Sequence, residues 1–178
     1  VNAATFAAAQ SVSLKNTLCN YNTTTGNDQN VIALQFTGSA QTVELDKIQV
    51  NSNGADGDGI IKALEVTEGQ SIVLQHAQLN GNTGGGDSNL VDFLTSIGSL
   101  TLNDVVINSN AITHATNGFN ILSLATPTNI TMDGVVINDN SVSGSGTFQA
   151  FVMSPSANSL ALNNVTISGN SSGTGTVR

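Results

Sequence analysis

The sequence predicts an all-β fold: a parallel β-helix, or solenoid, of about six coils that forms a single domain over residues 1–178. A nine-residue pattern that starts with Leu or Met and ends with Asn occurs six times, as in LDKIQVNSN and MDGVVINDN. Within each copy the apolar residues alternate, which is typical of β-strands. No 3.6-residue apolar period extends beyond a turn or two, and Gly, Asn, Ser and Thr are frequent, so long α-helices are not expected.

The six copies are nearly periodic. Their final asparagines are 31, 29, 28, 30 and 30 residues apart and are Asn22, Asn53, Asn82, Asn110, Asn140 and Asn170. A unit of this length cannot bury its apolar face alone, whereas stacked units share one continuous core. The period therefore predicts coils stacked along one axis.

Each coil is expected to contain at least three strands. In one copy, Leu100 and Leu102 form a first alternating pair, and Val105 and Ile107 form a second. The two strands could instead form a hairpin, because Asp133-Gly134, which lies between them in another copy, favours a tight turn. Six isolated hairpins, however, would leave six small apolar faces to bury. A third apolar segment follows at 31–36, 60–66, 90–94, 119–124 and 148–153, and residues 111–113 and 141–143 could add a short fourth strand.

The final asparagines predict a ladder along the rod. When equivalent turns stack at strand spacing, a side-chain amide can donate to the amide of one neighbouring coil and accept from the other. A second column, two residues earlier, holds Asn20, Asn51, Asn80, Asn108 and Asn138, with Ser168 in the last coil. We interpret both columns as structural, and Asn also tolerates the left-handed backbone of a sharp turn.

Charge and composition exclude several classes of partner. The chain has 4 Lys and Arg against 12 Asp and Glu, a formal net charge of −8, so it lacks the cations that bind nucleic acid. No run of 18 apolar residues occurs, so this segment is not expected to insert into a membrane. Aromatic residues make up only 4% of the chain, which predicts an aliphatic core, with Cys19 as a buried thiol.

The phrases LTLNDVVINSN, ITMDGVVINDN and LALNNVTISGNSSG resemble the PbH1 type of right-handed parallel β-helix repeat, and the resemblance covers all six coils. This repeat occurs in bacterial extracellular proteins, autotransporter passengers and the chlamydial polymorphic membrane proteins. The resemblance implies a right-handed coil and a secreted or cell-surface location. It does not imply one activity, because this scaffold carries lyases, hydrolases, phage tailspikes and adhesins.

No catalytic residues are predicted. Lyases of this fold act on polyuronates with basic residues, but the only Arg is Arg178 and the lysines lie in the first two coils. A glycosidase needs two carboxylates roughly 5 to 10 Å apart. Asp104 and Asp133, in neighbouring turns, are the nearest candidates, and solvated turn residues are the alternative interpretation. His76 and His114 lie in unrelated repeat positions, so no His cluster is expected.

The variable loops after the ladder carry the candidate binding residues. Residues 54–59, 83–89, 113–118 and 143–147 should line one edge of the rod. Asp56 and Asp58, with Asp87 in the next coil, supply the hard oxygen ligands that Ca²⁺ prefers. An EF-hand is excluded, because Gly54 stands where that loop needs its first Asp. The sequence thus predicts a binding edge at these acids, with Ca²⁺ as a candidate ion and solvated loops as the alternative.

The function predicted from these features is that of an adhesin-like stalk or interaction module without catalysis of its own, displayed on a cell surface or secreted. Its expected partner is a host or cell-surface protein or glycan. The alternative is a polysaccharide-active enzyme or a phage tailspike-like glycan-binding protein. The missing initiator Met and the final partial coil suggest that the chain is a fragment of a longer extracellular protein.

Overall fold

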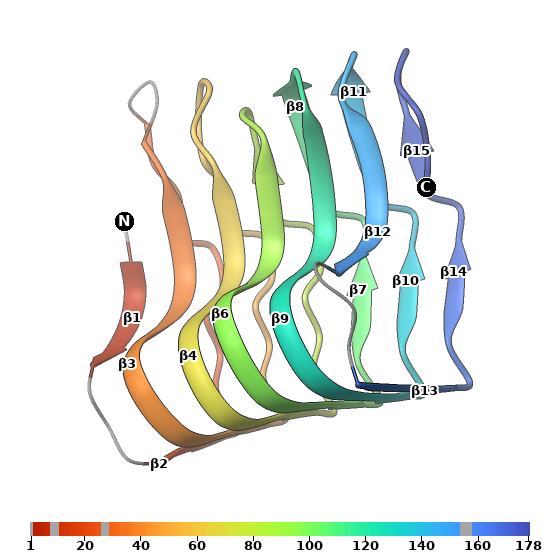
Figure 1. Ribbon diagram of the computed structural model, residues 1–178. Helices are drawn as coiled ribbons and strands as arrows, with labels where there is room; N and C mark the ends of the chain where they lie inside the picture. Colours follow the sequence, from red (N-terminus) through yellow and green to blue (C-terminus); the bar gives the residue numbers. More distant parts are fainter. Residues whose placement is uncertain (1, 8–10, 26–28, 154–157) are drawn as a thin grey trace.

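The computed structural model describes residues 2–7, 11–25, 29–153 and 158–178, and every regular element within them is a β-strand. The strands stack in parallel along one axis, and the chain winds through them as a solenoid (Figure 1). The parallel β-helix predicted from the repeat is therefore confirmed. No helix in these ranges is long and apolar enough to cross a membrane.

Three parallel sheets run along the rod. The largest contains the long strands β3 (Val31–Asp46), β4 (Ile61–Gln75), β6 (Ser88–Asn103) and β9 (Gly118–Asp133). It also contains β1 (Asn2–Ala7), β2 (Ser11–Lys15), β12 (Thr147–Met153) and β13 (Ser159–Asn163). The second sheet consists of β7 (Val106–Asn108), β10 (Val136–Asn138) and β14 (Thr166–Ser168). The third consists of β5 (Thr83–Gly84), β8 (Ala111–Ala115), β11 (Ser141–Gly144) and β15 (Ser171–Ser172).

The long strands differ from the sequence-based expectation. The sequence predicts separate strands for the third apolar segment of one coil and the first strand of the next, but in β3, β4, β6 and β9 the two are continuous. Register shifts lie between them, for example between Phe36 and Ser39 and between Val66 and Gly69. A bulge bends a strand without ending it, so the chain turns a corner of the coil there (Figure 1).

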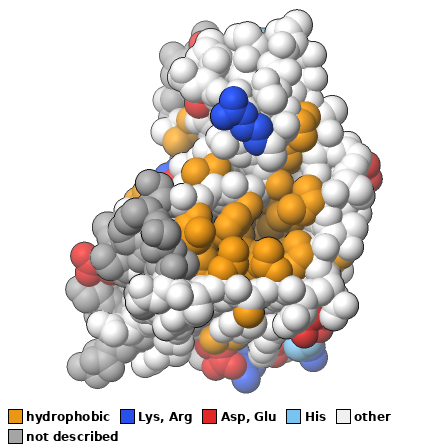
Figure 2. All heavy atoms as spheres, turned by 45° about the vertical axis from the view of Figure 1, so that its right-hand side comes forward, with side chains coloured by type: hydrophobic (Ala, Val, Ile, Leu, Met, Phe, Trp, Pro, Cys, Tyr) orange, Lys and Arg blue, Asp and Glu red, His pale blue; other side chains and the backbone are white. Residues whose placement is uncertain are grey.

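The core is mainly aliphatic, as the composition predicts, but it also contains four of the six Phe: Phe36, Phe93, Phe119 and Phe148. Leu74, Leu102 and Met132 occupy one inward column and are at most 3% exposed, and Cys19 is buried in the same cluster. In this structure the last coil packs against another described coil on one side only. Leu162, in the same column, is therefore 53% exposed, and apolar side chains gather at that end of the rod (Figure 2).

The final asparagines form a ladder, and its four middle members, Asn53, Asn82, Asn110 and Asn140, are buried. The backbone N–H and Nδ2 of Asn82 both donate to Oδ1 of Asn110, at 2.9 Å. Nδ2 of Asn82 also donates to the carbonyl oxygen of Val50 in the preceding coil, at 2.9 Å. The same pattern links Asn53 to Asn82 and Asn110 to Asn140. Each amide is thus satisfied in the interior, where an unpaired polar group would be costly.

The second asparagine column bonds in the opposite direction. Here Oδ1 of Asn51 accepts from the backbone N–H of Asn80 in the next coil, at 3.0 Å, and Oδ1 of Asn80 accepts from Asn108, at 2.9 Å. Between the two columns each coil has one residue with a left-handed backbone: Tyr21, Ser52, Gly81, Ser109, Asp139 and Gly169. The sharp turn therefore falls between the asparagines, and not on the ladder asparagines themselves.

Candidate functional site

The loops that follow the ladder stack along one edge of the rod, where the sequence places them. The backbone N–H of Gly85 donates to the carbonyl oxygen of Gly59 at 3.0 Å. A Cβ on Gly85 would lie 1.5 Å from the carbonyl oxygen of Gly57, so this approach requires glycine. The loops are shorter than predicted, because β5, β8 and β11 occupy part of their ranges.

Asp87 connects two of these loops. Its Oδ1 accepts hydrogen bonds from the backbone N–H groups of Thr116, Asn117 and Gly118, at 2.9, 2.9 and 3.0 Å. Its Oδ2 accepts from Nδ2 of Asn117 at 2.6 Å. Partial burial alone would raise the pKa of Asp87, but these hydrogen bonds outweigh that effect and hold the pKa below its usual value. Asp87 therefore holds the following loop in place.

The other two predicted edge acids have different surroundings. Oδ1 of Asp56 accepts from the backbone N–H of Gly57 at 2.9 Å, and Asp58 lies in the same turn, which stacks against Gly85 and Gly86. Within the described ranges, no group of three or more His, Cys, Asp or Glu side chains is arranged to hold a metal ion. Binding of Ca²⁺ at Asp56, Asp58 and Asp87 stays a prediction.

A charged triad lies on the wall of the large sheet. Lys62 on β4 donates through Nζ to Oε2 of Glu65 and, at 2.7 Å, to Oδ2 of Asp92 on β6. Oε1 of Glu65 accepts from Nε2 of Gln35 on β3, at 2.7 Å. Glu65 and Asp92 are only 6% and 3% exposed. Charged groups this deeply buried require partners, and Lys62 is the ion-pair partner of both carboxyl groups.

Hydrogen bonding determines the ionisation of this triad. Burial alone would lower the pKa of Lys62, but the bonds to Asp92 and Glu65 outweigh it and raise the pKa. Burial alone would raise the pKa of Glu65, but the bonds from Lys62 and Gln35 lower it. At rest Lys62 is therefore an ammonium and Glu65 a carboxylate, and their ion pairs with each other and between Lys62 and Asp92 form an ion cluster.

The triad was missed in the sequence, although a signal for it exists. Gln35, Glu65, Asp92 and Ser123 occupy the same register in successive long strands. Each of them is a polar residue that interrupts an apolar segment at the same place. The sequence analysis treats those segments as apolar strands, so it does not identify this polar column.

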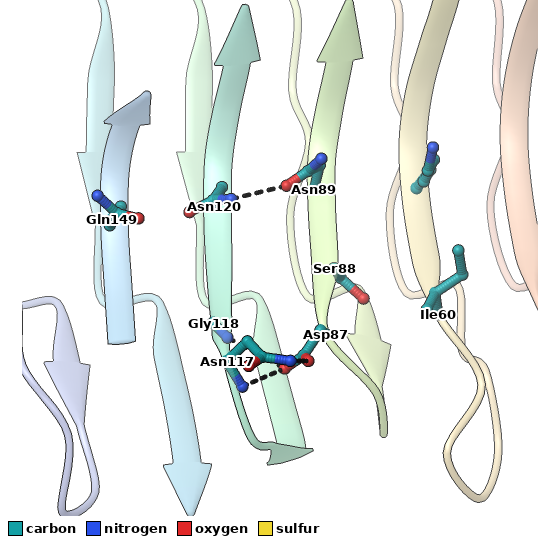
Figure 3. A pocket seen from close by; sticks show the side chains of 9 residues that line it. Ile60, Asp87, Ser88, Asn89, Asn117, Gly118, Asn120 and Gln149 are labelled. Carbon is teal, nitrogen blue, oxygen red and sulfur yellow. Dashed lines mark hydrogen bonds between the residues drawn. The ribbon is translucent and has the colours of Figure 1, made fainter. Parts of the chain in front are cut away.

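Next to the triad, the sheet wall carries a groove lined by amide side chains. A cavity of about 420 Å³ is bordered by Lys62, Asp87, Asn89, Asn117, Asn120 and Gln149, among others. We call it the amide groove. Asn89, Asn120 and Gln149 lie at successive levels of the rod, in register on β6, β9 and β12 (Figure 3). Nδ2 of Asn120 donates to Oδ1 of Asn89 at 2.8 Å.

The amides of this row are incompletely satisfied. Oδ1 of Asn120 is buried and has no hydrogen-bond partner among the described residues, and it points toward Gln149 (Figure 3). The side chain of Gln149 and Nδ2 of Asn89 likewise make no hydrogen bond within the described ranges. Nδ2 of Asn89 and the side-chain amide of Gln149 therefore offer donors and an acceptor to a ligand in the groove, whereas Oδ1 of Asn120 is buried beside Gln149.

A second polar cluster surrounds His76 on another corner of the coil. Nδ1 of His76 lies 2.8 Å from Oδ1 of Asp46, and Nε2 lies 3.7 Å from Oδ2 of Asp104. The hydrogen bond with His76 lowers the pKa of Asp46. Sequence reasoning missed this contact, because it compared His76 only with His114. Asp104 and Asp133, the two carboxylates considered above as a glycosidase pair, have separate partners. Asp104 lies near His76, whereas Oδ1 of Asp133 accepts a hydrogen bond from Nδ2 of Asn164 at 3.0 Å.

Together these features define a parallel β-solenoid with internal asparagine ladders, a stacked loop edge and a polar groove on one wall. No family model, no curated protein and no solved structure matches the chain.

Proposed function

We propose that the chain is an interaction module of a secreted or cell-surface protein, built from right-handed repeats of the PbH1 type and without catalysis of its own. The amide groove is its binding site. The observation that supports this proposal is the row of Asn89, Asn120 and Gln149 along one rigid wall, in which Nδ2 of Asn89 and the amide of Gln149 are left without a hydrogen-bond partner among the described residues. Ligand sites combine a concave surface with a few fixed polar groups of this kind.

The chemistry of the groove favours a neutral, hydroxyl-rich glycan as partner. An amide both donates and accepts, and so does a sugar hydroxyl. Three carboxylates, Asp87, Glu65 and Asp92, lie in or beside the groove with only Lys62 to balance them. The local net charge is negative, which disfavours polyanions such as polyuronates. Consecutive amides would contact a chain that runs along the rod axis, at strand spacings of about 4.8 Å.

A glycan array tests the proposal. The labelled protein is expected to be retained by neutral glycans in preference to acidic ones, and the double variant Asn89→Ala/Gln149→Ala should lose that retention. Asn163→Ala, at an exposed position on β13, is the matched control and should bind normally. Retention by no glycan, or equal retention of the double variant, would contradict the proposal. Retention by immobilised proteins alone would favour a protein partner.

One observation supports the alternative of a polysaccharide-active enzyme: Glu65 and Asp92 place two carboxylates side by side on neighbouring strands. Both are engaged by Lys62, however, and a glycosidase needs one carboxyl group free to protonate the leaving group. Incubation with neutral and uronate glycans tests this alternative. Release of new reducing ends or unsaturated products that is abolished by Glu65→Gln or Asp133→Asn would establish an enzyme.

A further inference from the structure

We propose that Lys62 and Asp92 condense to form an intramolecular amide bond, which links two neighbouring coils of the solenoid covalently. This proposal is independent of what the amide groove binds. Nζ of Lys62 lies 2.7 Å from Oδ2 of Asp92. The two residues lie on β4 and β6, which are adjacent strands of the large sheet.

The surroundings of this pair differ from those of an ordinary surface ion pair. The side chains of Lys62 and Asp92 are 12% and 4% exposed. For comparison, Lys15 and Glu44 lie 4.0 Å apart with side chains 57% and 40% exposed. An exposed pair is solvated and moves freely. The Lys62 amine, in contrast, is held against one carboxyl group.

Glu65 supplies a group that can carry protons between the two reactants. It accepts a hydrogen bond from Nζ of Lys62, and it is the register partner of Asp92 on the neighbouring strand. Gln35 holds its other oxygen at 2.7 Å. A positioned carboxyl group within hydrogen-bond reach of the reacting amine is the geometry that general acid and base catalysis requires.

The reaction balances without a co-reactant. Lys62 transfers a proton through Glu65 to Asp92, which leaves a neutral amine beside a neutral carboxyl group and does not change the charge of the triad. Nζ then attacks Cγ of Asp92, and the C–N bond forms. One carboxyl oxygen leaves as water, with its second proton taken from the amine through Glu65. Glu65 ends as a carboxylate, so one ammonium and one carboxylate become one amide and one water.

Two physical effects favour the product. The reactants are tethered in contact, and well-oriented intramolecular reactions reach effective molarities of about 10⁵–10⁸ M. Condensation also removes two buried charges, whose desolvation is costly, while the carboxylate of Glu65 loses its cation and keeps the hydrogen bond from Gln35. Because the ion cluster is the resting state, the neutral amine is rare. The bond needs to form only once in each molecule, however, so a slow reaction is sufficient.

Intact-mass spectrometry of the folded protein is the test. After incubation at neutral pH, the wild type is expected to weigh one water less than its sequence mass. Digestion with chymotrypsin should yield a branched peptide that joins Lys62 to Asp92. Trypsin has no site between these two residues, and it should no longer cleave after Lys62. Lys62→Met should keep the full mass, Glu65→Gln should slow the mass loss strongly, and the surface control Lys15→Met should behave as the wild type.

The measurement on the wild type decides the proposal even if a variant fails to fold. A folded wild-type protein, checked by circular dichroism, that keeps its full sequence mass and its tryptic cleavage after Lys62 would overturn the proposal. Loss of water that persists in Lys62→Met would also overturn it, because the dehydration would then come from another site. Neither result would affect the glycan array, so this proposal and the proposed function fail separately.

Discussion

The amides of Asn110 and Asn140 are joined inside the rod: Nδ2 of Asn110 lies 2.8 Å from Oδ1 of Asn140, and its backbone N–H lies 3.0 Å from the same oxygen. Both residues are fully buried. One oxygen therefore satisfies a side chain and a backbone group of the preceding coil. The contact repeats along the rod, so the ladder couples the stability of each coil to that of its neighbours.

Asn110→Leu should lower the free energy of unfolding by about 3 kcal/mol or more, because each buried polar group left without a partner costs about 1–3 kcal/mol. The substitution removes the acceptor for both donors of Asn82 and the donor for the carbonyl oxygen of Leu79. Asn103→Leu, at a partly exposed position of the same coil, is the control and should cost far less. Equal urea midpoints for the two variants would contradict a stabilising ladder.

Gly85→Ala should destabilise the stacked loops. The added Cβ would lie 1.5 Å from the carbonyl oxygen of Gly57, so the backbone must move, at a cost of about 1–3 kcal/mol for overpacking. At Gly54 the nearest atom, Oγ1 of Thr83, would be 3.2 Å away, and Gly54→Ala should have a much smaller effect. Thermal unfolding of the two variants checks this prediction. A wild-type melting temperature for Gly85→Ala would show that the loops do not stack closely.

The loop held by Asp87 should loosen in acid. Its pKa is lower in the folded protein than in the unfolded chain, so its contribution to stability is present above the unfolded value, about 3.9, and is lost as the pH falls through the folded value. NMR chemical shifts of the Thr116 to Gly118 amides should therefore titrate below that unfolded value. Asp87→Asn should abolish this titration. A wild-type titration at or above the unfolded value would contradict the hydrogen-bonded carboxylate.

Cys19 should react slowly with thiol reagents in the folded protein. It is 7% exposed, and burial raises the pKa of its thiol, so little of the reactive thiolate is present at neutral pH. The rate of modification by Ellman's reagent should rise sharply in urea, with the same midpoint as global unfolding. A fast reaction in buffer alone would show that the first coil opens independently of the rest.

The ladder illustrates how far the sequence can predict this fold. Asn53, Asn82, Asn110 and Asn140 recur at one repeat position, and stacking places equivalent residues in contact, so periodicity alone predicts the column. The direction of the hydrogen bonds is not encoded in that period. The inner column donates to the following coil and the outer column to the preceding one, because the left-handed residue between them, such as Asp139, turns the backbone.

The candidate site was less accessible to sequence reasoning. Asp87 was predicted on the loop edge, but its five hydrogen bonds with residues 116–118 depend on how two loops of different length pack. The contact between Lys62 and Asp92 joins different register positions of neighbouring coils. It depends on the backbone path of the long strands β4 and β6 around these residues, which cannot be predicted from the pattern of apolar residues.

The sequence by itself determined the all-β class, the stacking axis, the inward columns and the two asparagine columns, because each of these follows from a repeat that places like residues above like. Only the tertiary structure decided where the long strands bend, which turn residues are left-handed, and which polar side chains meet on the wall of the rod. These features depend on side-chain geometry between coils that are not identical. For that reason the triad of Lys62, Glu65 and Asp92 and the amide groove beside it became visible only in the folded chain.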